Sequence, residues 1–236
     1  MAIATALVRP LVPRSPLLRS SYLSWSSTSA QRPASSAVRP PSPKRQARKP
    51  KPIKRFVPDE VKKFVKPDGK LLTTPQNRDF LLQHGLEPDN GRMTLLHGGP
   101  ELSRAASDFS AMLAYSPRHI IHPFDLRYFE PRGHPLAPMK RAKYAHKTRH
   151  EPMWIMVSCA GNASAVVRTL TRRRLTRCIY EALHGLGYRA GSRNGEVSKV
   201  WGTLWVVVHD PVKAATQSPE RFGRVVADAL VKNCRT

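Results

Sequence analysis

Residues 153–187 read MWIMVSCAGNASAVVRTLTRRRLTRCIYEALHGLG, and this stretch decides the fold. It opens with a short continuous apolar run, Met153–Cys159, of the kind that forms buried strands. A helix is predicted over Thr169–Leu186, because apolar residues recur there at the spacing of one helical face. These residues are Leu175, Cys178, Ile179, Ala182, Leu183 and Leu186.

A second strand and a second helix follow. Trp201–His209 is another apolar run, and it ends at the turn signal Asp210–Pro211. The final helix is predicted over Pro219–Lys232, with Ser218 as its N-cap. This order predicts the α/β class, as an α+β sandwich with a small sheet and packed helices. The connections are long enough for parallel strands, and strand order stays open.

The side of the first helix opposite its apolar stripe is cationic. Five arginines fall within ten residues, and Glu181 alone offers an i,i+4 partner. A guanidinium group binds phosphate bidentately and stacks on bases, and Tyr or His rings stack as well. An RNA-contacting face is predicted, and a merely solvated face is the alternative. The predicted RNA-binding residues here are Arg168, Arg172, Arg173, Arg174, Arg177, Tyr180 and His184.

A second basic segment occupies residues 131–150, which contain no acid. It is predicted to be a loop or a frayed basic helix that also contacts RNA. Its candidate RNA-binding residues are Lys140, Arg141, Lys143, Lys147 and Arg149.

Composition favours an anionic partner for the chain. It has 236 residues with 40 Lys+Arg against 16 Asp+Glu, a net charge of +24. Such a charge points to nucleic acid first and to an anionic membrane surface second. Three cysteines are too few for a disulfide scaffold, and no apolar run is long enough for a transmembrane helix.

Four regions are predicted along the chain. Residues 1–39 are rich in Arg and Ser and lack acids, which is typical of a mitochondrial transit peptide and places the protein in the matrix. A basic tail of a nuclear or cytosolic protein is the alternative. Residues 40–58 form a disordered Pro/Lys/Arg linker, 59–117 a helical extension and 118–236 an α/β RNA-binding domain.

Short elements are expected upstream of the first apolar strand. Helices are predicted at Asp59–Lys66, at Pro75–Leu86 with Thr74 as N-cap, and at Pro100–Tyr115. Arg118–Glu130 has β character that Pro123 weakens.

Val157–Ser158 closes the first strand, Ala165–Arg168 supplies the letters AVVR, and the arginine cluster follows. This arrangement resembles the protein subunit of bacterial-type ribonuclease P, whose strand, Gly-Asn-Ala-Val-Val-Arg link and RNRxKRxxREAF helix come in that order. The last strand and helix of the chain are similar to those of the family. Arg173 replaces the motif's Asn, and Cys159–Ala160 stand where a Lys pair is expected. The resemblance covers about 80 residues.

The resemblance implies a ribosomal-protein-like α/β fold whose arginine helix faces RNA. In that family RNA and bound metal ions perform the hydrolysis, and the protein positions the substrate. It therefore implies no catalytic residue in the protein.

Enzymatic sites are not predicted from the residues either. His119-x2-His122 and His146-x3-His150 have spacings that suit a metal, but a third ligand is missing. Cys159 has no identifiable base partner. The prediction is therefore no catalytic residue, no metal and no cofactor.

The sequence thus predicts a mitochondrial RNA-binding protein, a non-catalytic subunit of a ribonucleoprotein that processes tRNA in a ribonuclease P-like way. A structural protein of the mitochondrial ribosome is the alternative. Its partners would be structured RNA, either rRNA or a tRNA precursor, and other ribonucleoprotein subunits. Attachment to the anionic inner membrane is a third reading, which lacks a suitable amphipathic helix.

Overall fold

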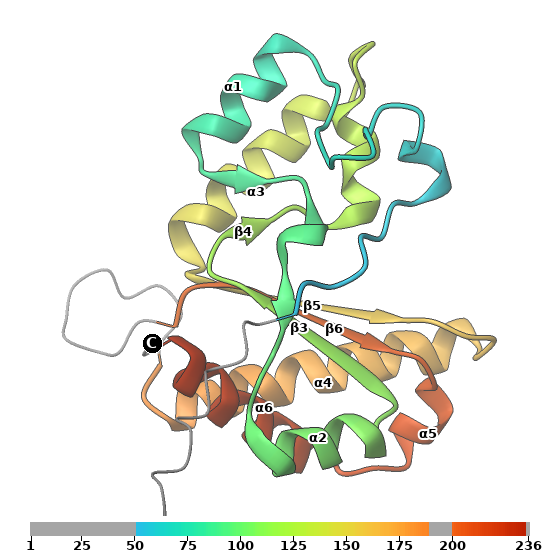
Figure 1. Cartoon of the computed structure of the whole chain (residues 1–236), viewed down its shortest axis with the longest axis vertical. Helices are drawn as coiled ribbons and strands as arrows, with labels where there is room; N and C mark the ends of the chain where they lie inside the picture. Colours follow the sequence, from blue (N-terminus) through green and yellow to red (C-terminus); the bar gives the residue numbers. More distant parts are fainter. Residues whose placement is uncertain (1–50, 189–199, 235–236) are drawn as a thin grey trace, which may run out of the picture. The chain divides into compact units, whose positions relative to one another are not determined.

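A computed structural model describes residues 51–188 and 200–234, which lie within one compact unit spanning Ala47–Thr236 (Figure 1). The predicted transit peptide and the first eleven residues of the predicted linker, 40–50, lie outside the described residues.

A four-stranded mixed sheet organises this unit. The order is β2 (Thr94–Leu95), β3 (Ala111–Ser116), β6 (Gly202–Val208) and β5 (Met153–Cys159). β2 and β3 are antiparallel, as are β3 and β6, whereas β5 and β6 are parallel and are joined through α4 (Ala165–Gly185). The predicted small sheet with packed helices is confirmed, and β5 is an edge strand of this sheet.

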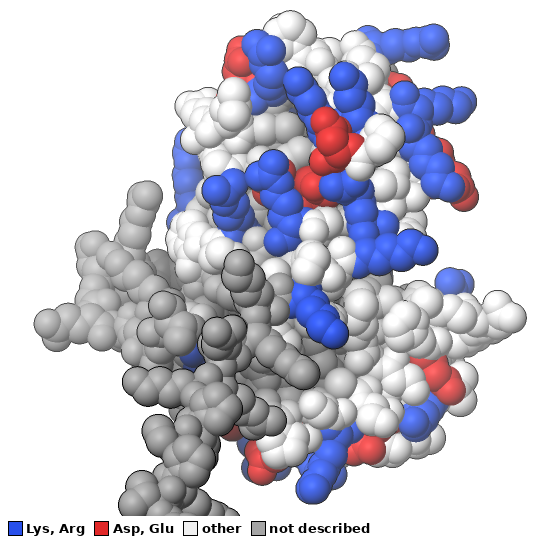
Figure 2. Space-filling model, in the orientation of Figure 1, with Lys and Arg blue, Asp and Glu red and all other residues white. Residues whose placement is uncertain are grey.

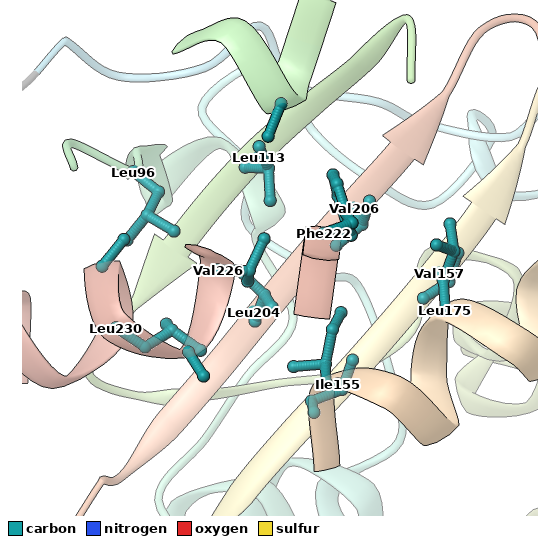
Figure 3. Packing of buried hydrophobic residues seen from close by; sticks show 14 of the residues in the cluster. Leu96, Leu113, Ile155, Val157, Leu175, Leu204, Val206, Phe222, Val226 and Leu230 are labelled. Carbon is teal, nitrogen blue, oxygen red and sulfur yellow. The ribbon is translucent and has the colours of Figure 1, made fainter. Parts of the chain in front are cut away.

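One face of the sheet is covered by helices α2 (Gly99–Asp108), α4 and α6 (Pro219–Cys234) (Figure 1). α4 and α6 approach closely at Gly223, where an added Cβ would overlap the backbone carbonyl of Cys178. Figure 3 shows the apolar side chains that meet between the layers. They include Leu96, Leu113, Ile155, Val157, Leu175, Leu204, Val206, Phe222, Val226 and Leu230. The short helix α5 (Pro211–Ala215) also contributes Ala214 to this core.

The other face carries a second layer with its own core. Strand residues alternate between the faces, so Trp154 belongs to this layer while Ile155 belongs to the first. Its helical elements are η1 (Asp59–Val61), α1 (Pro75–Gln83), η3 (Pro123–Phe129) and α3 (Ala137–His150). Smaller parts are the parallel pair β1 (Leu86–Glu87) and β4 (His119–Ile120), and the single turn η2 (Asn90–Arg92).

The predicted boundary between residues 117 and 118 is wrong. β2, α2 and β3 lie in the proposed helical extension, yet they build the sheet and its first core. The helix predicted over Pro100–Tyr115 ends at Asp108, and Ser110 turns the chain with φ of 45°. Residues 111–116 instead form β3, which pairs with β2 on one side and with β6 on the other. Both neighbours satisfy its backbone N–H and C=O groups.

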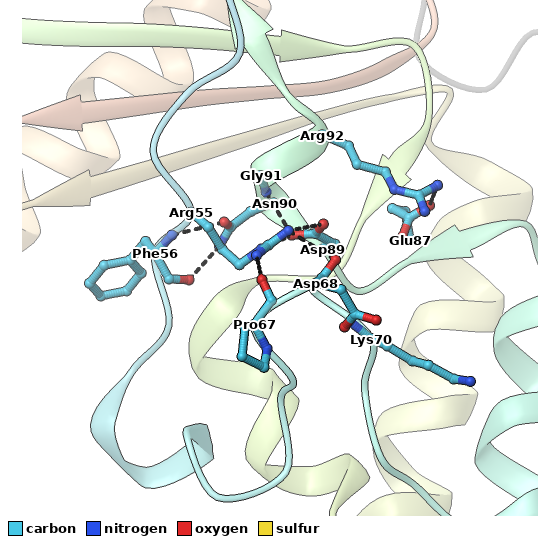
Figure 4. Close-up of polar contacts among 10 residues, drawn as sticks. All are labelled: Arg55, Phe56, Pro67, Asp68, Lys70, Glu87, Asp89, Asn90, Gly91 and Arg92. Atoms are coloured by element: carbon cyan, nitrogen blue, oxygen red, sulfur yellow. Dashed lines mark hydrogen bonds and ion pairs between the residues drawn. The ribbon is translucent and has the colours of Figure 1, made fainter.

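The second half of the predicted disordered linker is also corrected. Ile53 is buried, and its N–H donates to Met93 O at 3.0 Å. Arg55 donates from Nε and Nη2 to the two carboxylate oxygens of Asp89, at 2.6 and 2.8 Å (Figure 4). Asn90 bonds both backbone groups of Phe56, at 2.7 and 3.0 Å. Residues 51–58 are therefore part of the fold.

The other secondary-structure predictions are confirmed in part. The strand at Met153–Cys159 is confirmed to the residue, and the final helix begins at Pro219 as predicted. Residues 137–150 form a helix, one of the two alternatives for that segment. The β character predicted for residues 118–130 extends only over β4, after which the chain forms η3. In the described ranges, no helix is both long and apolar enough to cross a membrane.

Candidate nucleic-acid interface

Helix α4 presents one buried and one cationic side. It starts at the N-cap Ser164, whose hydroxyl accepts from Val167 N at 3.3 Å. Its buried stripe includes Leu175, Ile179 and Leu183, as the spacing predicts. The five arginines of this helix are all exposed: Arg168, Arg172, Arg173, Arg174 and Arg177.

These arginines have little internal counter-charge. Arg177 forms an ion pair with Glu181 at 3.4 Å, and the two side chains are 68% and 63% exposed. Such an exposed pair is weak. Within residues 51–188 and 200–234, the other four arginines form no ion pair. The cationic side is therefore neither buried nor neutralised by this part of the chain.

A hollow of about 470 Å³ lies along the outer side of β5, between α3 and α4. The floor is made by residues 154–157 of β5. Arg172, Arg173 and Arg177 line it from α4, and Lys143 and Lys147 line it from α3. The structure thus brings together the two basic segments that the sequence presents separately.

A smaller hollow of about 250 Å³ shares His122, Val157 and Arg172 with the larger one. Arg168 and Phe124 also line it, and Phe124 is 52% exposed. The rings of His122 and Phe124 lie 5.6 Å apart between centroids. We call the two connected hollows the β5 groove. It combines cations with an accessible aromatic ring, as single-stranded RNA sites do.

Two of the α3 candidates are held inside the fold. Lys140 Nζ lies 2.8 Å from Asp125, which also accepts from the Tyr144 hydroxyl at 2.9 Å. Burial opposes the charged form of Asp125, but these two donors outweigh it and hold its pKa below the ordinary value. Arg141 donates to Asn77 Oδ1 at 2.7 Å. Lys140 and Arg141 therefore stabilise the second layer and do not line the β5 groove.

Lys147 occupies an intermediate position in the groove. Its ammonium lies over the Trp154 ring, 4.7 Å from the centroid, and 3.7 Å from Glu151. Burial lowers the pKa of Lys147. Lys143 is exposed and lines the groove, and Arg149 is exposed without lining it.

Three candidates on α4 lie outside the groove. The Tyr180 hydroxyl donates to Met153 O at 3.2 Å, its ring is half-buried against the core, and burial raises its pKa to about 12. Arg174 lines a small apolar hollow with Leu170 and Ala214. His184 is exposed in the last turn of the helix.

The sequence analysis missed the histidine, aromatic and acidic residues that line the groove, namely His122, Phe124, Asp125, Tyr144 and Trp154. No spacing signal identifies them, because they come from three elements that meet only after folding. Burial lowers the pKa of His122, and the charges of Lys147 and Arg172 add to this effect, while Asp125 opposes it. The imidazole therefore favours its neutral form.

The histidine pair of α3 and Cys159 have the following surroundings in the described part of the chain. It contains no group of three His, Cys, Asp or Glu side chains arranged to hold a metal ion. His146 and His150 stack on each other, with centroids 4.0 Å apart. Cys159 donates from Sγ to Arg168 O at 3.6 Å, and burial raises the pKa of its thiol.

Basic side chains also gather away from α4. On the face shown in Figure 2, Lys and Arg are numerous over the part of the molecule that carries α1, and several Asp and Glu side chains are interspersed among them. The β5 groove differs from this surface because it is concave and lined from two helices.

Neither a protein-family model, nor a curated protein, nor a solved structure matches the chain.

Proposed function

We propose that this protein binds RNA along the β5 groove, as a non-catalytic subunit of a ribonucleoprotein in the mitochondrial matrix. The observation that carries the proposal is the arginine side of α4, which is exposed, has within the described residues only the weak Arg177–Glu181 ion pair, and forms one wall of a hollow. Like charges so placed repel one another until an anion enters. The matrix location rests on the composition of residues 1–39.

RNA suits this groove better than a membrane surface does. A concave site with guanidinium groups on one wall and ammonium groups on the other can follow a phosphate backbone. Phe124 and His122 offer rings on which a base can stack. A bilayer would require a continuous exposed apolar helix face beside the cations, whereas α4 exposes Val166 and Leu170 near its start and buries Leu175, Ile179 and Leu183 in the core.

The salt dependence of binding tests the proposal. The double variant R172Q/R173Q removes two exposed charges from the groove, and R221Q/R224Q removes two exposed charges from α6 as the matched control. Each lost phosphate contact should lower the slope of log affinity against log salt by roughly 0.7–0.9 for single-stranded or duplex nucleic acid. We expect a change of about 1.5 for the groove variant and none for the control. Equal slopes for the two variants would remove the groove from the interface.

A structural role in the mitochondrial ribosome is the second candidate. It is favoured by the twelve basic residues that precede Asp59, the first acid of the chain. Sucrose gradients of matrix extract in high salt separate the two roles. Stoichiometric co-migration with a ribosomal subunit supports the ribosomal role. Co-migration with precursor tRNA supports the ribonuclease P-like processing role.

A further inference from the structure

The two hollows of the β5 groove differ in what lines them. The larger hollow has cations on both helical walls, and the one carboxylate that lines it is Asp125. That carboxylate is already bound by Lys140 and by the Tyr144 hydroxyl. The smaller hollow has the exposed Phe124 ring and a single pair of arginines, Arg168 and Arg172.

The larger hollow therefore holds an excess of positive charge at short range. Lys147 is 26% exposed and has its ammonium against a tryptophan ring, so it is partly stripped of water. Its one ion-pair partner among the described residues, Glu151, lies at 3.7 Å, beyond the length of a good hydrogen bond. Arg172 and Arg173 approach the same space without an ion-pair partner in the described residues. A multiply charged anion would relieve this repulsion more than a singly charged one.

A terminal phosphate fits these features better than a phosphate inside a strand. A phosphomonoester carries a charge of about −1.5 to −2 and three strong acceptor oxygens. An internal phosphodiester carries a single charge and has chain leaving on both sides. The larger hollow is lined from β4, η3, α3, β5 and α4, and it joins the smaller one at His122, Val157 and Arg172. A strand that enters with its end in the larger hollow can leave through the smaller one.

We propose that the β5 groove receives the phosphorylated end of an RNA strand. The terminal phosphomonoester lies in the larger hollow between Lys147 and the arginines of α4, and the first base lies against Phe124 in the smaller hollow. This inference rests on the proposed function, and it adds that the groove recognises strand ends.

Binding of matched strands to the full chain tests the inference. The probes are three fluorescent oligoribonucleotides of one sequence with a 5′-phosphate, a 3′-phosphate or hydroxyl groups at both ends. We expect one phosphorylated strand to bind about tenfold more tightly than the hydroxyl strand, the effect of one added charged hydrogen-bonding group. Inorganic phosphate at constant ionic strength should compete for this strand and leave the hydroxyl strand bound. Comparison of the strand with a 5′-phosphate and the strand with a 3′-phosphate identifies which end is recognised.

Lysine variants test whether the preference for a phosphorylated strand arises in the larger hollow. K143Q/K147Q should abolish the tenfold preference, whereas the control K63Q/K66Q, which removes two exposed lysines from the segment that follows η1, should retain it. Lys147 also packs on Trp154, so its substitution can disturb the fold. The single variant K143Q changes only an exposed side chain, and it should reduce the preference for the phosphorylated strand. If all three strands bind equally tightly, end recognition is refuted while RNA binding stands. If none binds, both proposals fail.

Discussion

The two faces of the central sheet are stabilised in different ways. On the face covered by α2, α4 and α6, the buried side chains of the described residues are apolar apart from Thr171 of α4, and the charges of α4 lie outside the cluster. On the face covered by α1 and α3, buried polar groups such as Asn77, Asp89 and Asn90 form hydrogen bonds within the packing. The first face is stabilised by removing hydrocarbon from water, and the second also depends on specific polar partners.

This difference explains why the cations of α3 and α4 have different roles. Both helices are basic in sequence, but the layer below α3 supplies Asp125 and Asn77 as partners for Lys140 and Arg141. The layer below α4 supplies apolar atoms, so its arginines stay exposed. Charge patterning alone does not distinguish a structural cation from one that is free for a ligand.

The apolar face is tested most strongly by Phe222→Ala. Phe222 is fully buried, and its ring lies 4.5 Å from that of Phe109 between centroids. The substitution should lower the free energy of unfolding by about 4 kcal/mol, because it removes a buried ring and leaves a cavity. Urea unfolding measures this change. Val212→Ala, at a side chain that is 58% exposed, is the control and should cost less than about 0.5 kcal/mol. A cost below about 1 kcal/mol for Phe222→Ala would mean that the two faces do not differ as described.

The polar face is tested by Asp125→Ala. The substitution leaves Lys140, which is 13% exposed, and the buried Tyr144 hydroxyl without their shared acceptor. We expect a loss of about 2–3 kcal/mol in the same unfolding experiment, since partly buried donors become unsatisfied. Asp228→Ala removes an exposed carboxylate from α6 and should change stability by less than about 0.5 kcal/mol. Equal effects of the two substitutions would show that the Asp125 network contributes nothing.

The elements that are predictable from the sequence are those whose structure depends on a local pattern and not on distant contacts. Met153–Cys159 and the final helix are predictable because their apolar patterns carry the information locally. Residues 111–116 are not, because the preceding turn at Ser110 uses a positive φ without glycine, and the strand depends on distant neighbours. Residues 51–58 join the fold through Arg55 and Asp89, which are 34 positions apart. No local pattern reports such a pair.

The candidate site also has a part that local patterns predict and a part that depends on distant contacts. The arginines of α4 follow from helical periodicity, and the structure leaves them exposed as predicted. Tyr180 lies on the predicted side, but its hydroxyl reaches the backbone of β5 and ties the ring to the core. The opposite wall from α3, and the aromatic residues between the walls, depend on how two layers pack against β5. The sequence therefore indicates the cations of both walls, including Lys143 and Lys147, but not that the two walls face each other.

Lowering the pH should reduce the stability of the protein through the buried His119 on the polar face. His119 is buried between Trp154 and Trp201, with centroids 4.3 and 4.5 Å away. Burial, helped by the charge of Lys147, lowers its pKa from 6.5 to about 4. The unfolded chain therefore binds a proton between pH 6.5 and 4 that the folded protein does not. Stability is fully present above pH 6.5 and falls by up to about 3 kcal/mol as the pH drops to 4.

Urea unfolding at several pH values measures this effect. His119→Gln should be less stable at pH 7 and should lose most of the slope between pH 6.5 and 4. His146→Asn, at an exposed histidine, should keep the slope of the parent protein. The carboxylates of Asp89 and Asp125 have lowered pKa values, so their contribution is lost at lower pH and does not mask that of His119. A parent protein without pH dependence in this window would contradict a neutral buried His119.

The smallest expected effect is the most informative about α4. R172Q/R173Q removes two charges that have no ion-pair partner in the described residues, and glutamine keeps a good helix propensity. Stability should therefore change by less than about 0.5 kcal/mol, and at low salt it should rise by a few tenths because repulsion along the helix decreases. A charge that costs the free protein stability, yet is required for RNA binding in the salt experiment, acts in binding and not in folding. A loss above about 1 kcal/mol would instead assign these arginines to the fold, as Lys140 and Arg141 are assigned on α3.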